Sequence, residues 1–257
     1  MERLTHFLKI KIRDLERLRP DLDLSEALEK PSSLHPFNSF EYVIAHLLAC
    51  GILSLAQYRA LREDYQQRNK FLALYEITAP RTFGESWAQR HLREIAPALV
   101  KPSVELDADY RGQYDLLYQS IRIEVKASRA VRRQSGGTLI SKALASDSAA
   151  GFDMNFQQLK PACCDVFVWM GVWRDRIRYW GLSQRDVAES PFYTARQHRG
   201  NRGEGQLWLD EKNIDQFARF EAREDNVLTC IKERFASLTE SPELQALENA
   251  DDSASVR

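Results

Sequence analysis

Long hydrophobic runs are missing from the 257-residue chain. No stretch of 18 apolar residues occurs, and charged side chains interrupt the amino-terminal segment MERLTHFLKIKIRDLERLRP every two or three positions. A transmembrane helix needs about 20 predominantly apolar residues, and a secretory signal contains an apolar segment of about 7–15 residues. Neither is expected here, so the default expectation is a cytoplasmic protein that has no membrane partner.

Cysteine and histidine are scarce, and their spacing matches no common metal motif. The four cysteines are Cys50, Cys163, Cys164 and Cys230, of which only the adjacent pair lies close together in the sequence. Adjacent cysteines share neither a normal disulfide nor a zinc-ligand spacing. The five histidines form no HxxH, HxH or HExxH arrangement. We therefore expect four reduced, structural cysteines and no zinc chemistry.

A strong charge of either sign is also missing, because 36 basic and 37 acidic side chains leave a formal net charge of −1. This balance argues against non-specific coating of nucleic acid. The charges are unevenly distributed, however, since residues 122–142 carry six basic side chains and one acidic side chain. Such a local basic stripe permits the docking of a polyanion.

The chain is long enough for one large or two modest domains, and 44% hydrophobic residues are enough for a core. Helical spacing of apolar residues predicts helices at about 3–19, 38–50 and 54–76. We expect residues 1–78 to form a helical subdomain and residues 79–238 to form the core domain. Residues 239–257 are acidic and poor in apolar groups, which is typical of a disordered tail.

The core domain is predicted to be α/β (α+β), with helices on both sides of a small mixed sheet. FGESWAQRHLREI has helical periodicity, whereas the periodicity changes to two from about Ser103 onward. The elements expected after Ser103 are strands within VELDADYRGQYDLLYQSIRIEVKAS, a short helix in MNFQQLKP, a buried strand in CDVFVWMGVW, a β segment in RIRYWGLS, the strand QLWL, and a helix at about 213–238.

The segment QYDLLYQSIRIEVKAS contains two acids and a lysine within two otherwise alternating runs. If Gln119–Ser120 is the turn of a hairpin, Asp115 directly faces Glu124, and Lys126 shares their face. Opposite residues have Cβ atoms about 4.5–5.5 Å apart, so two bare carboxylates would repel each other. A hard divalent cation between them converts this repulsion into binding energy.

Two alternatives to this interpretation stay open. The three side chains could form a surface ion-pair array without any chemistry, because exposed pairs are common and weak. Gln-Ser is also a poor type I′ turn, so a longer loop would shift the register of the hairpin.

YDLLYQSIRIEVKAS resembles the D…ExK signature of the PD-(D/E)XK nuclease superfamily, with Asp115, Glu124 and Lys126 in the three motif positions. The resemblance covers roughly residues 80–185 and implies a restriction-endonuclease-like core. Two departures are that Tyr114 precedes the first acid, where proline is common, and that only eight residues separate the acids.

The resemblance implies a Mg²⁺-dependent DNA endonuclease, with Mn²⁺ as a possible substitute for Mg²⁺. Asp115 and Glu124 would hold the metal, and Lys126 would assist the attacking water. Glu85 matches a helix glutamate that supports the metal, or a second metal, in many members.

A type II restriction endonuclease acting on double-stranded DNA as a homodimer is the first interpretation, with a cognate DNA methyltransferase encoded nearby. A repair or recombination nuclease of the same fold and a non-cleaving DNA-binding protein are the alternatives.

Several polar side chains are candidates for DNA contacts. Lysine and arginine would contact phosphates, and amide and guanidinium groups in a loop near residues 193–206 would contact base edges. The candidates are Arg129, Arg132 and Arg133 in the basic run; Gln157 and Lys160, which match a later helix position of some family members; and Arg196, Gln197, His198, Arg199, Asn201 and Arg202. Solvated polar loops without a ligand remain the alternative for both loop segments.

Overall fold

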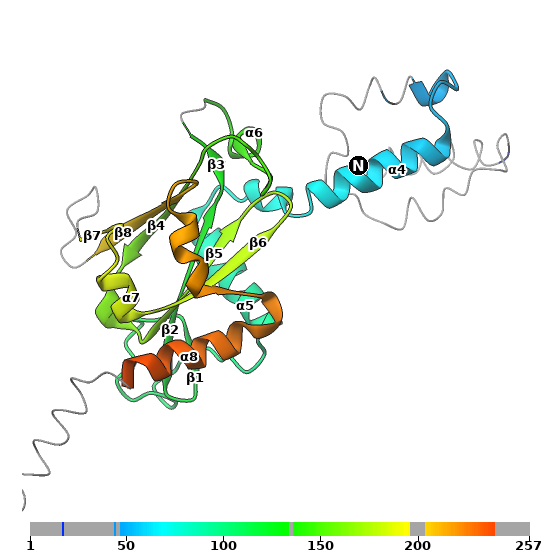
Figure 1. Ribbon diagram of the computed structural model, residues 1–257. Helices are drawn as coiled ribbons and strands as arrows, with labels where there is room; N and C mark the ends of the chain where they lie inside the picture. The colour runs from blue at the N-terminus through cyan, green and yellow to red at the C-terminus, as the bar shows by residue number, and fades with distance from the viewer. Residues whose placement is uncertain (1–16, 18–43, 45–46, 134–135, 196–203, 240–257) are drawn as a thin grey trace, which may run out of the picture. The chain divides into compact units, whose positions relative to one another are not determined.

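The computed structural model describes residues 17, 44, 47–133, 136–195 and 204–239, apart from the side chain of Glu85 (Figure 1). The chain divides into two compact units, Met1–Gln66 and Gln67–Arg257. The second unit combines two sheets with several helices, which confirms the mixed α+β class. In the described part of the chain, no helix has both the length and the apolar character needed to cross a membrane.

The helix α4 (Leu55–Arg68) begins with a reciprocal cap. The Ser54 hydroxyl accepts a hydrogen bond from the Gln57 backbone N–H (3.2 Å), and the Gln57 side-chain oxygen accepts one from the Ser54 N–H (2.9 Å). Such a capping box satisfies two N–H groups that the first helical turn leaves without partners. The helix predicted at 54–76 therefore exists but ends at Arg68. Most of the two earlier predicted helices, and the acidic tail after residue 239, lie outside the described residues.

A five-stranded mixed sheet carries the predicted hairpin. Its strands, in spatial order, are β1 (Leu116–Tyr118), β2 (Ile121–Arg129), β5 (Val166–Val172), β6 (Ile177–Ser183) and β9 (Glu221–Ala222). The β2–β5 pair is parallel, and the other pairs are antiparallel. All seven residues of β5 are buried, as expected for a continuous apolar run at the centre of a sheet.

A second sheet is antiparallel throughout. Its strands, in spatial order, are β3 (Val131–Arg132), β4 (Phe152–Leu159), β8 (Gly205–Asp210) and β7 (Tyr193–Thr194). The strand β2 leads into β3 after one intervening residue, Ala130, so one extended segment passes from the first sheet to the second. The Asn155 N–H donates to the Ser128 hydroxyl (3.0 Å), which ties β4 to the end of β2.

The remaining elements are short helices and turns. They are the 3₁₀ turn η2 (Leu72–Tyr75), the π-helix η3 (Thr82–Ala88), α5 (Gln89–Ile95), α6 (Leu139–Lys142), the 3₁₀ turn η4 (Pro161–Cys163), α7 (Gln184–Ala188), the 3₁₀ helix η5 (Ile214–Phe220), the 3₁₀ turn η6 (Glu224–Asn226) and α8 (Val227–Thr239).

The two faces of the five-stranded sheet contact different layers. On one face, Ile123 and Val168 pack with residues of α5 and α8, such as Leu92 and Ile231. On the other face, aromatic side chains of β5 and β6 pack against apolar residues of β4, β8 and η5; these include Phe167, Trp169, Trp180, Met154, Phe156, Leu207 and Phe217. Figure 1 shows α8 and the β4–β8 pair on different sides of β5 and β6. Three tryptophans of this region, Trp169, Trp173 and Trp180, are buried.

The prediction of a helix in MNFQQLKP was wrong, because these residues belong to the strand β4. A bulge shifts the register between Gln157 and Leu159, and Gln158 has a left-handed φ of 56°. The bulge adds one residue to the strand, so Phe156 and Leu159 both face the core although they are three residues apart. That three-residue spacing imitates a helical face in the sequence.

Two further predictions need correction. Residues 103–115 form turns instead of strands, and Val104 and Leu106 are exposed. The helix predicted at about 213–238 begins only at Val227, because Phe217 and Phe220 are buried by η5 and the next two residues pair with β6 as β9. The three-residue spacing of the two phenylalanines therefore reflects a 3₁₀ helix in this region and not an α-helix.

Candidate active site

The hairpin forms in the predicted register and brings the two acids together. Leu116 pairs with Ile123, and Tyr118 pairs with Ile121. Just before β1, the Asp115 N–H donates to the Ile123 carbonyl (3.0 Å), so the backbone pairing continues to the acid. The Asp115 carboxylate also accepts a hydrogen bond from the Val125 N–H at Oδ2 (2.9 Å). Asp115 is therefore fixed against the strand that carries the second acid.

Glu124 and Lys126 occupy the face of β2 opposite its buried residues, as the alternation predicts. The Lys126 Nζ atom lies 2.8 Å from Glu124 Oε1, and the two side chains are only 18% and 13% exposed, respectively. An ion pair this close in a mostly buried position differs from the weak, solvated pairs of an open surface. The alternative of an exposed ion-pair array is thus disfavoured.

Burial raises the pKa of Glu124 to about 7, because the ionised carboxylate is poorly solvated there. The negative charge of Asp115 raises this pKa further, whereas the nearby Lys126 ammonium lowers it. Burial and the second acid together outweigh the lysine. The ionised form of Glu124 is therefore disfavoured in this site, despite the ion pair with Lys126.

Gln89, which the sequence analysis did not select, completes the surroundings of Asp115. The Gln89 Nε2 atom donates to Asp115 Oδ1 (2.7 Å) from the first residue of α5. Its neighbours Ala88 and Leu92 are buried against the sheet, which fixes the helix face that carries Gln89. Because the side chain of Glu85 is not described, the predicted metal contact of Glu85 stays a prediction. The sequence feature that could have identified Gln89 is its position one helical turn after Glu85.

Removing the Gln89 amide should weaken the site through Asp115. We expect Gln89→Leu to destabilise the protein by about 1 kcal/mol, because one oxygen of a partly buried carboxylate loses its donor. Any activity that depends on the Asp115 position should fall by roughly 10–100-fold, as is usual for groups that orient metal ligands. Chemical denaturation and DNA cleavage rates measure the two effects. The control is Gln216→Leu on the exposed side of η5; equal behaviour of the two variants would contradict the assigned role.

Lys160 lies at the edge of this site, immediately after β4. Its Nζ atom is 2.9 Å from Glu204 Oε1, and this contact raises the pKa of Lys160, with a smaller contribution from the charge of Glu124. A hydrogen bond from Cys164 lowers the pKa of the Cys163 thiol. The positive charges of Lys126 and Lys160 lower this pKa further. The predicted lysine thus follows a strand and does not lie on a helix.

The other predicted DNA contacts have different surroundings. Arg129 is half-buried over the Phe83 ring (3.5 Å) and donates to the Leu74 and Ile77 carbonyls. Burial lowers its pKa to about 10. Arg132 and Gln157 are exposed. Arg129 is therefore engaged within the fold, whereas Arg132 and Gln157 lie at the surface. The predicted loop residues, Arg196, Gln197, His198, Arg199, Asn201 and Arg202, lie outside the described residues.

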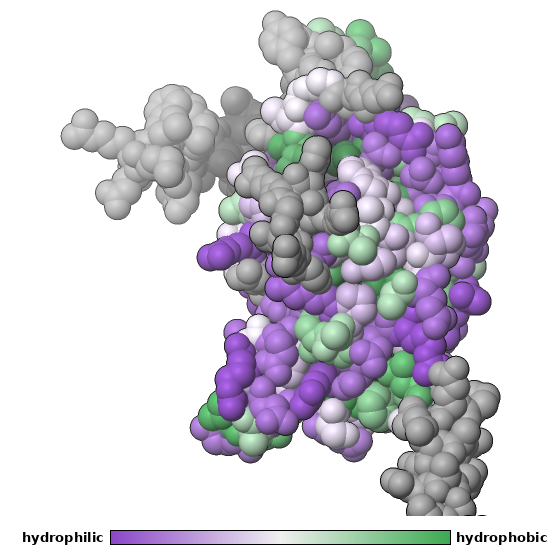
Figure 2. Space-filling view, turned by 90° about the vertical axis from the view of Figure 1, so that its left-hand side faces the viewer, coloured by the Kyte–Doolittle hydropathy of each residue, from purple (hydrophilic) through white to green (hydrophobic). Residues whose placement is uncertain are grey.

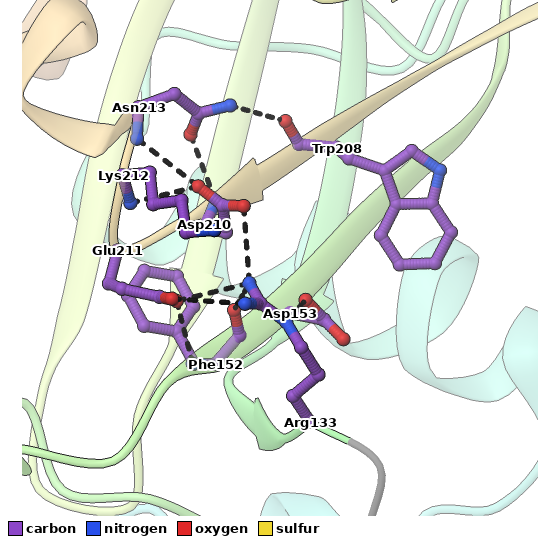
Figure 3. A network of polar contacts seen from close by, with 8 residues as sticks. All are labelled: Arg133, Phe152, Asp153, Trp208, Asp210, Glu211, Lys212 and Asn213. Atoms are coloured by element: carbon purple, nitrogen blue, oxygen red, sulfur yellow. Dashed lines mark hydrogen bonds and ion pairs between the residues drawn. The ribbon is translucent and has the colours of Figure 1, made fainter.

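Arg133 is the centre of an ion-pair network that joins β3 to β4 and β8 (Figure 3). Its guanidinium contacts Asp153 Oδ1 (2.8 Å), Asp210 Oδ2 (3.1 Å) and Glu211 Oε1 (3.0 Å). It also donates to the Phe152 carbonyl (3.2 Å). A guanidinium that serves three carboxylates and a carbonyl is built into the fold, so a phosphate would have to compete with these groups.

Arg133→Met should lower the thermal unfolding midpoint, and the loss should be larger at pH 8 than at pH 4. The reason is that the variant leaves three carboxylates close together, and they repel one another only when ionised. Differential scanning fluorimetry at the two pH values measures this effect. Unchanged stability together with weaker DNA binding would instead assign Arg133 to a phosphate contact.

The donor chemistry of the site fits a hard divalent cation. Within the described part of the chain, no three His, Cys, Asp or Glu side chains gather as ligands for one metal ion. Mg²⁺, however, is commonly held by one or two carboxylates, with water and substrate phosphate completing its shell. Asp115 and Glu124 bring two carboxylates to one hairpin, and burial disfavours the ionised form of Glu124 in the absence of a further cation. These two residues would hold the ion.

Comparisons with known proteins add no family assignment. No protein-family model matches the chain, and no curated protein matches it.

Proposed function

We propose that the protein is a Mg²⁺-dependent DNA endonuclease with a restriction-endonuclease-like core, most specifically a type II restriction endonuclease. The observation that carries the proposal is the cluster of Asp115, Glu124 and Lys126 on one hairpin, with Lys126 Nζ 2.8 Å from Glu124 Oε1 in a mostly buried position. Two carboxylates that can hold a divalent cation, beside a lysine that can offset developing negative charge, suit metal-assisted phosphodiester hydrolysis.

Each side chain has a distinct role in this proposal. Asp115 and Glu124 hold the cation, which supplies Lewis-acid polarisation of a phosphoryl oxygen when it is bound. Lys126 orients the attacking water and offsets the negative charge that develops on the phosphoryl group. Gln89 holds the Asp115 carboxylate in position through its 2.7 Å hydrogen bond. The products are a 5′-phosphate and a 3′-hydroxyl.

Double-strand cleavage would require two such sites. A homodimer supplies them with two-fold symmetry, which matches the symmetry of a palindromic target. A cognate DNA methyltransferase encoded nearby would protect the host genome if the enzyme acts in restriction. Mn²⁺ should substitute for Mg²⁺, since carboxylate, carbonyl and water ligands suit both ions.

The test is incubation of the purified protein with plasmid DNA of mixed sequence and Mg²⁺, with an EDTA control. The proposal predicts discrete fragments with 5′-phosphate ends and no cleavage in EDTA. A smear of random products would favour a repair nuclease over a restriction enzyme. Salt-sensitive DNA binding without cleavage under any divalent ion would favour a non-cleaving DNA-binding protein.

A further inference from the structure

The β4–β8 pair has an outer face, opposite the apolar face that packs against the first sheet. The antiparallel β3–β4 pairing runs β4 back past the end of β2, and the Asn155–Ser128 hydrogen bond (3.0 Å) ties the two strands together. The end of β4 then leads to Lys160, whose Nζ atom lies 2.9 Å from Oε1 of Glu204, the residue before β8.

Amides and one indole occupy the middle of this outer face. Asn155 pairs across the ladder with Trp208, and Gln157 pairs with Gln206. The Trp208 side chain is unusually accessible for a strand residue, with 46% of its surface exposed. In Figure 3 its indole points away from the Arg133 network. An exposed aromatic among amides is a typical composition for a surface that contacts bases.

The side-chain contacts of Asn155 do not all stabilise the fold. Its Nδ2 atom donates to Gln206 Oε1 (3.2 Å), whereas its buried Oδ1 atom has no hydrogen-bond partner among the described residues. A buried acceptor without a donor destabilises a fold. The bulge beyond Gln157, with its left-handed Gln158, adds backbone strain of the kind found at binding sites. The hydrogen bond from Asn155 to Gln206 holds the Gln206 side chain on this face.

We propose that the outer face of the β4–β8 pair contacts base edges in the major groove of the DNA substrate, through Gln157, Gln206 and Trp208. This inference rests on the proposed nuclease function and names the surface that such an enzyme would use for its substrate. A two-stranded β-ribbon fits the major groove, and glutamine pairs with the N6 and N7 groups of adenine. Trp208 supplies apolar contact area for a thymine methyl group. The surface should therefore favour A·T-containing sites.

Charge limits where DNA lies on this face. The acids Asp153, Asp210 and Glu211 gather around Arg133 at the end of the ladder away from Lys160. Their net negative charge disfavours phosphates there, so the backbone of the DNA should approach at the Lys160 end, where the Lys160 side chain pairs with Glu204 but is 51% exposed. On the side of the molecule that Figure 2 shows, the visible surface outside the grey atoms is mostly hydrophilic. A polar, hydrogen-bonding ligand fits such a surface better than an apolar protein face does.

The experiment measures binding separately from cleavage. Fluorescently labelled 20-base-pair duplexes, one A·T-rich and one G·C-rich, are titrated with the full-length protein in Ca²⁺ at several salt concentrations. Trp208→Ala should weaken binding about tenfold, because the apolar contact with the thymine methyl group is lost. It should leave the salt dependence unchanged, whereas Lys160→Ala should reduce the salt slope by about one. Gln206→Ala should reduce the preference for the A·T-rich duplex.

The matched control is Leu106→Ala, which truncates another exposed apolar side chain, in the loop before β1. Circular dichroism melting confirms that each variant is folded, and Trp208→Phe should bind better than Trp208→Ala. Equal binding by Trp208→Ala and wild type would overturn the inference, as would a weaker binding that appears equally in Leu106→Ala. Mg²⁺-dependent cleavage is measured in parallel. If the wild type cleaves DNA and Trp208→Ala binds as tightly as the wild type, only the proposed binding surface is wrong. If Trp208→Ala weakens binding but the wild type does not cleave DNA, only the proposed nuclease function is wrong.

Discussion

Glu124→Gln and Lys126→Met should each reduce the rate of DNA cleavage by about a thousandfold or more. Removing one preorganised electrostatic group from a hydrolytic site commonly lowers the rate by about 10²–10³. Here each change also disturbs its neighbour, since the Lys126 Nζ and Glu124 Oε1 atoms are 2.8 Å apart. Single-turnover cleavage of plasmid DNA at saturating Mg²⁺ measures the rate.

A structural explanation for such losses is separable from a catalytic one. Lys101→Met makes the same chemical change at an exposed lysine before β1 and should keep the wild-type rate. Both site variants should still bind the labelled duplex in Ca²⁺. Cleavage at the wild-type rate by Lys126→Met would remove the lysine from the mechanism, and loss of folding in either variant would show up as a lower melting temperature.

The second large effect concerns the pH dependence of stability. The pKa of Glu124 is about 7 in the folded protein, compared with an ordinary value of 4.5. The folded state therefore binds this proton more tightly than the unfolded state does, so stability decreases as the pH rises from 4.5 to 7. A difference of this size corresponds to a free energy on the order of 3 kcal/mol.

Glu124→Gln removes this titration and keeps the shape of the side chain. Relative to wild type, the variant should gain stability as the pH is raised from 5 to 8, by an amount on the order of 3 kcal/mol. Urea denaturation at a series of pH values measures the difference. Glu94→Gln is the control, because Glu94 lies on the exposed face of α5 and should show no such trend. If the stability of Glu124→Gln and that of the wild type changed with pH in parallel, the result would contradict a poorly solvated Glu124 carboxylate in the folded protein.

This prediction connects stability to function. A carboxylate held in a poorly solvated position next to a second acid destabilises the folded protein, and a bound cation would relieve that destabilisation. Mg²⁺ should therefore raise the wild-type melting temperature more at pH 8 than at pH 5, because binding only to the folded state stabilises it. The effect should be small in Glu124→Gln.

The hairpin could be predicted from the sequence because its information is local. Alternating apolar residues on both sides of a two-residue link set the register, and a one-residue slip would have moved Ile123 out of the core. Gln119 has a φ of 53°, as the first residue of a type II′ turn does, although glycine is preferred there. The relation of Asp115 to Glu124 and Lys126 follows directly from that register.

Other features depend on contacts that the sequence does not encode locally. The parallel pairing of β2 with β5 joins segments separated by some forty residues. This pairing contributes to the burial of the strand that carries Glu124. The hydrogen bond from Gln89 to Asp115 spans 26 residues. In β4, the bulge at Gln158 replaces the period of two by a three-residue step. Local periodicity therefore predicted a helix where a strand forms.

The basic run shows a different limit of sequence analysis. Charge alone does not distinguish an arginine that contacts phosphate from one that serves the fold. Arg129 donates to backbone carbonyls and stacks on Phe83, whereas Arg133 pairs with three acids from distant strands. Only tertiary structure reveals these partners, because they lie 20 or more residues away along the chain.

The central claim is that Asp115 and Glu124 together form the divalent-cation site at which DNA is cleaved. The most direct test is the rate of plasmid cleavage as a function of Mg²⁺ concentration, for the wild-type protein and for Asp115→Asn. We predict a saturable, Mg²⁺-dependent rate for the wild type and no measurable cleavage by a folded Asp115→Asn variant at any Mg²⁺ concentration. The same Mg²⁺ dependence in both proteins would contradict the claim.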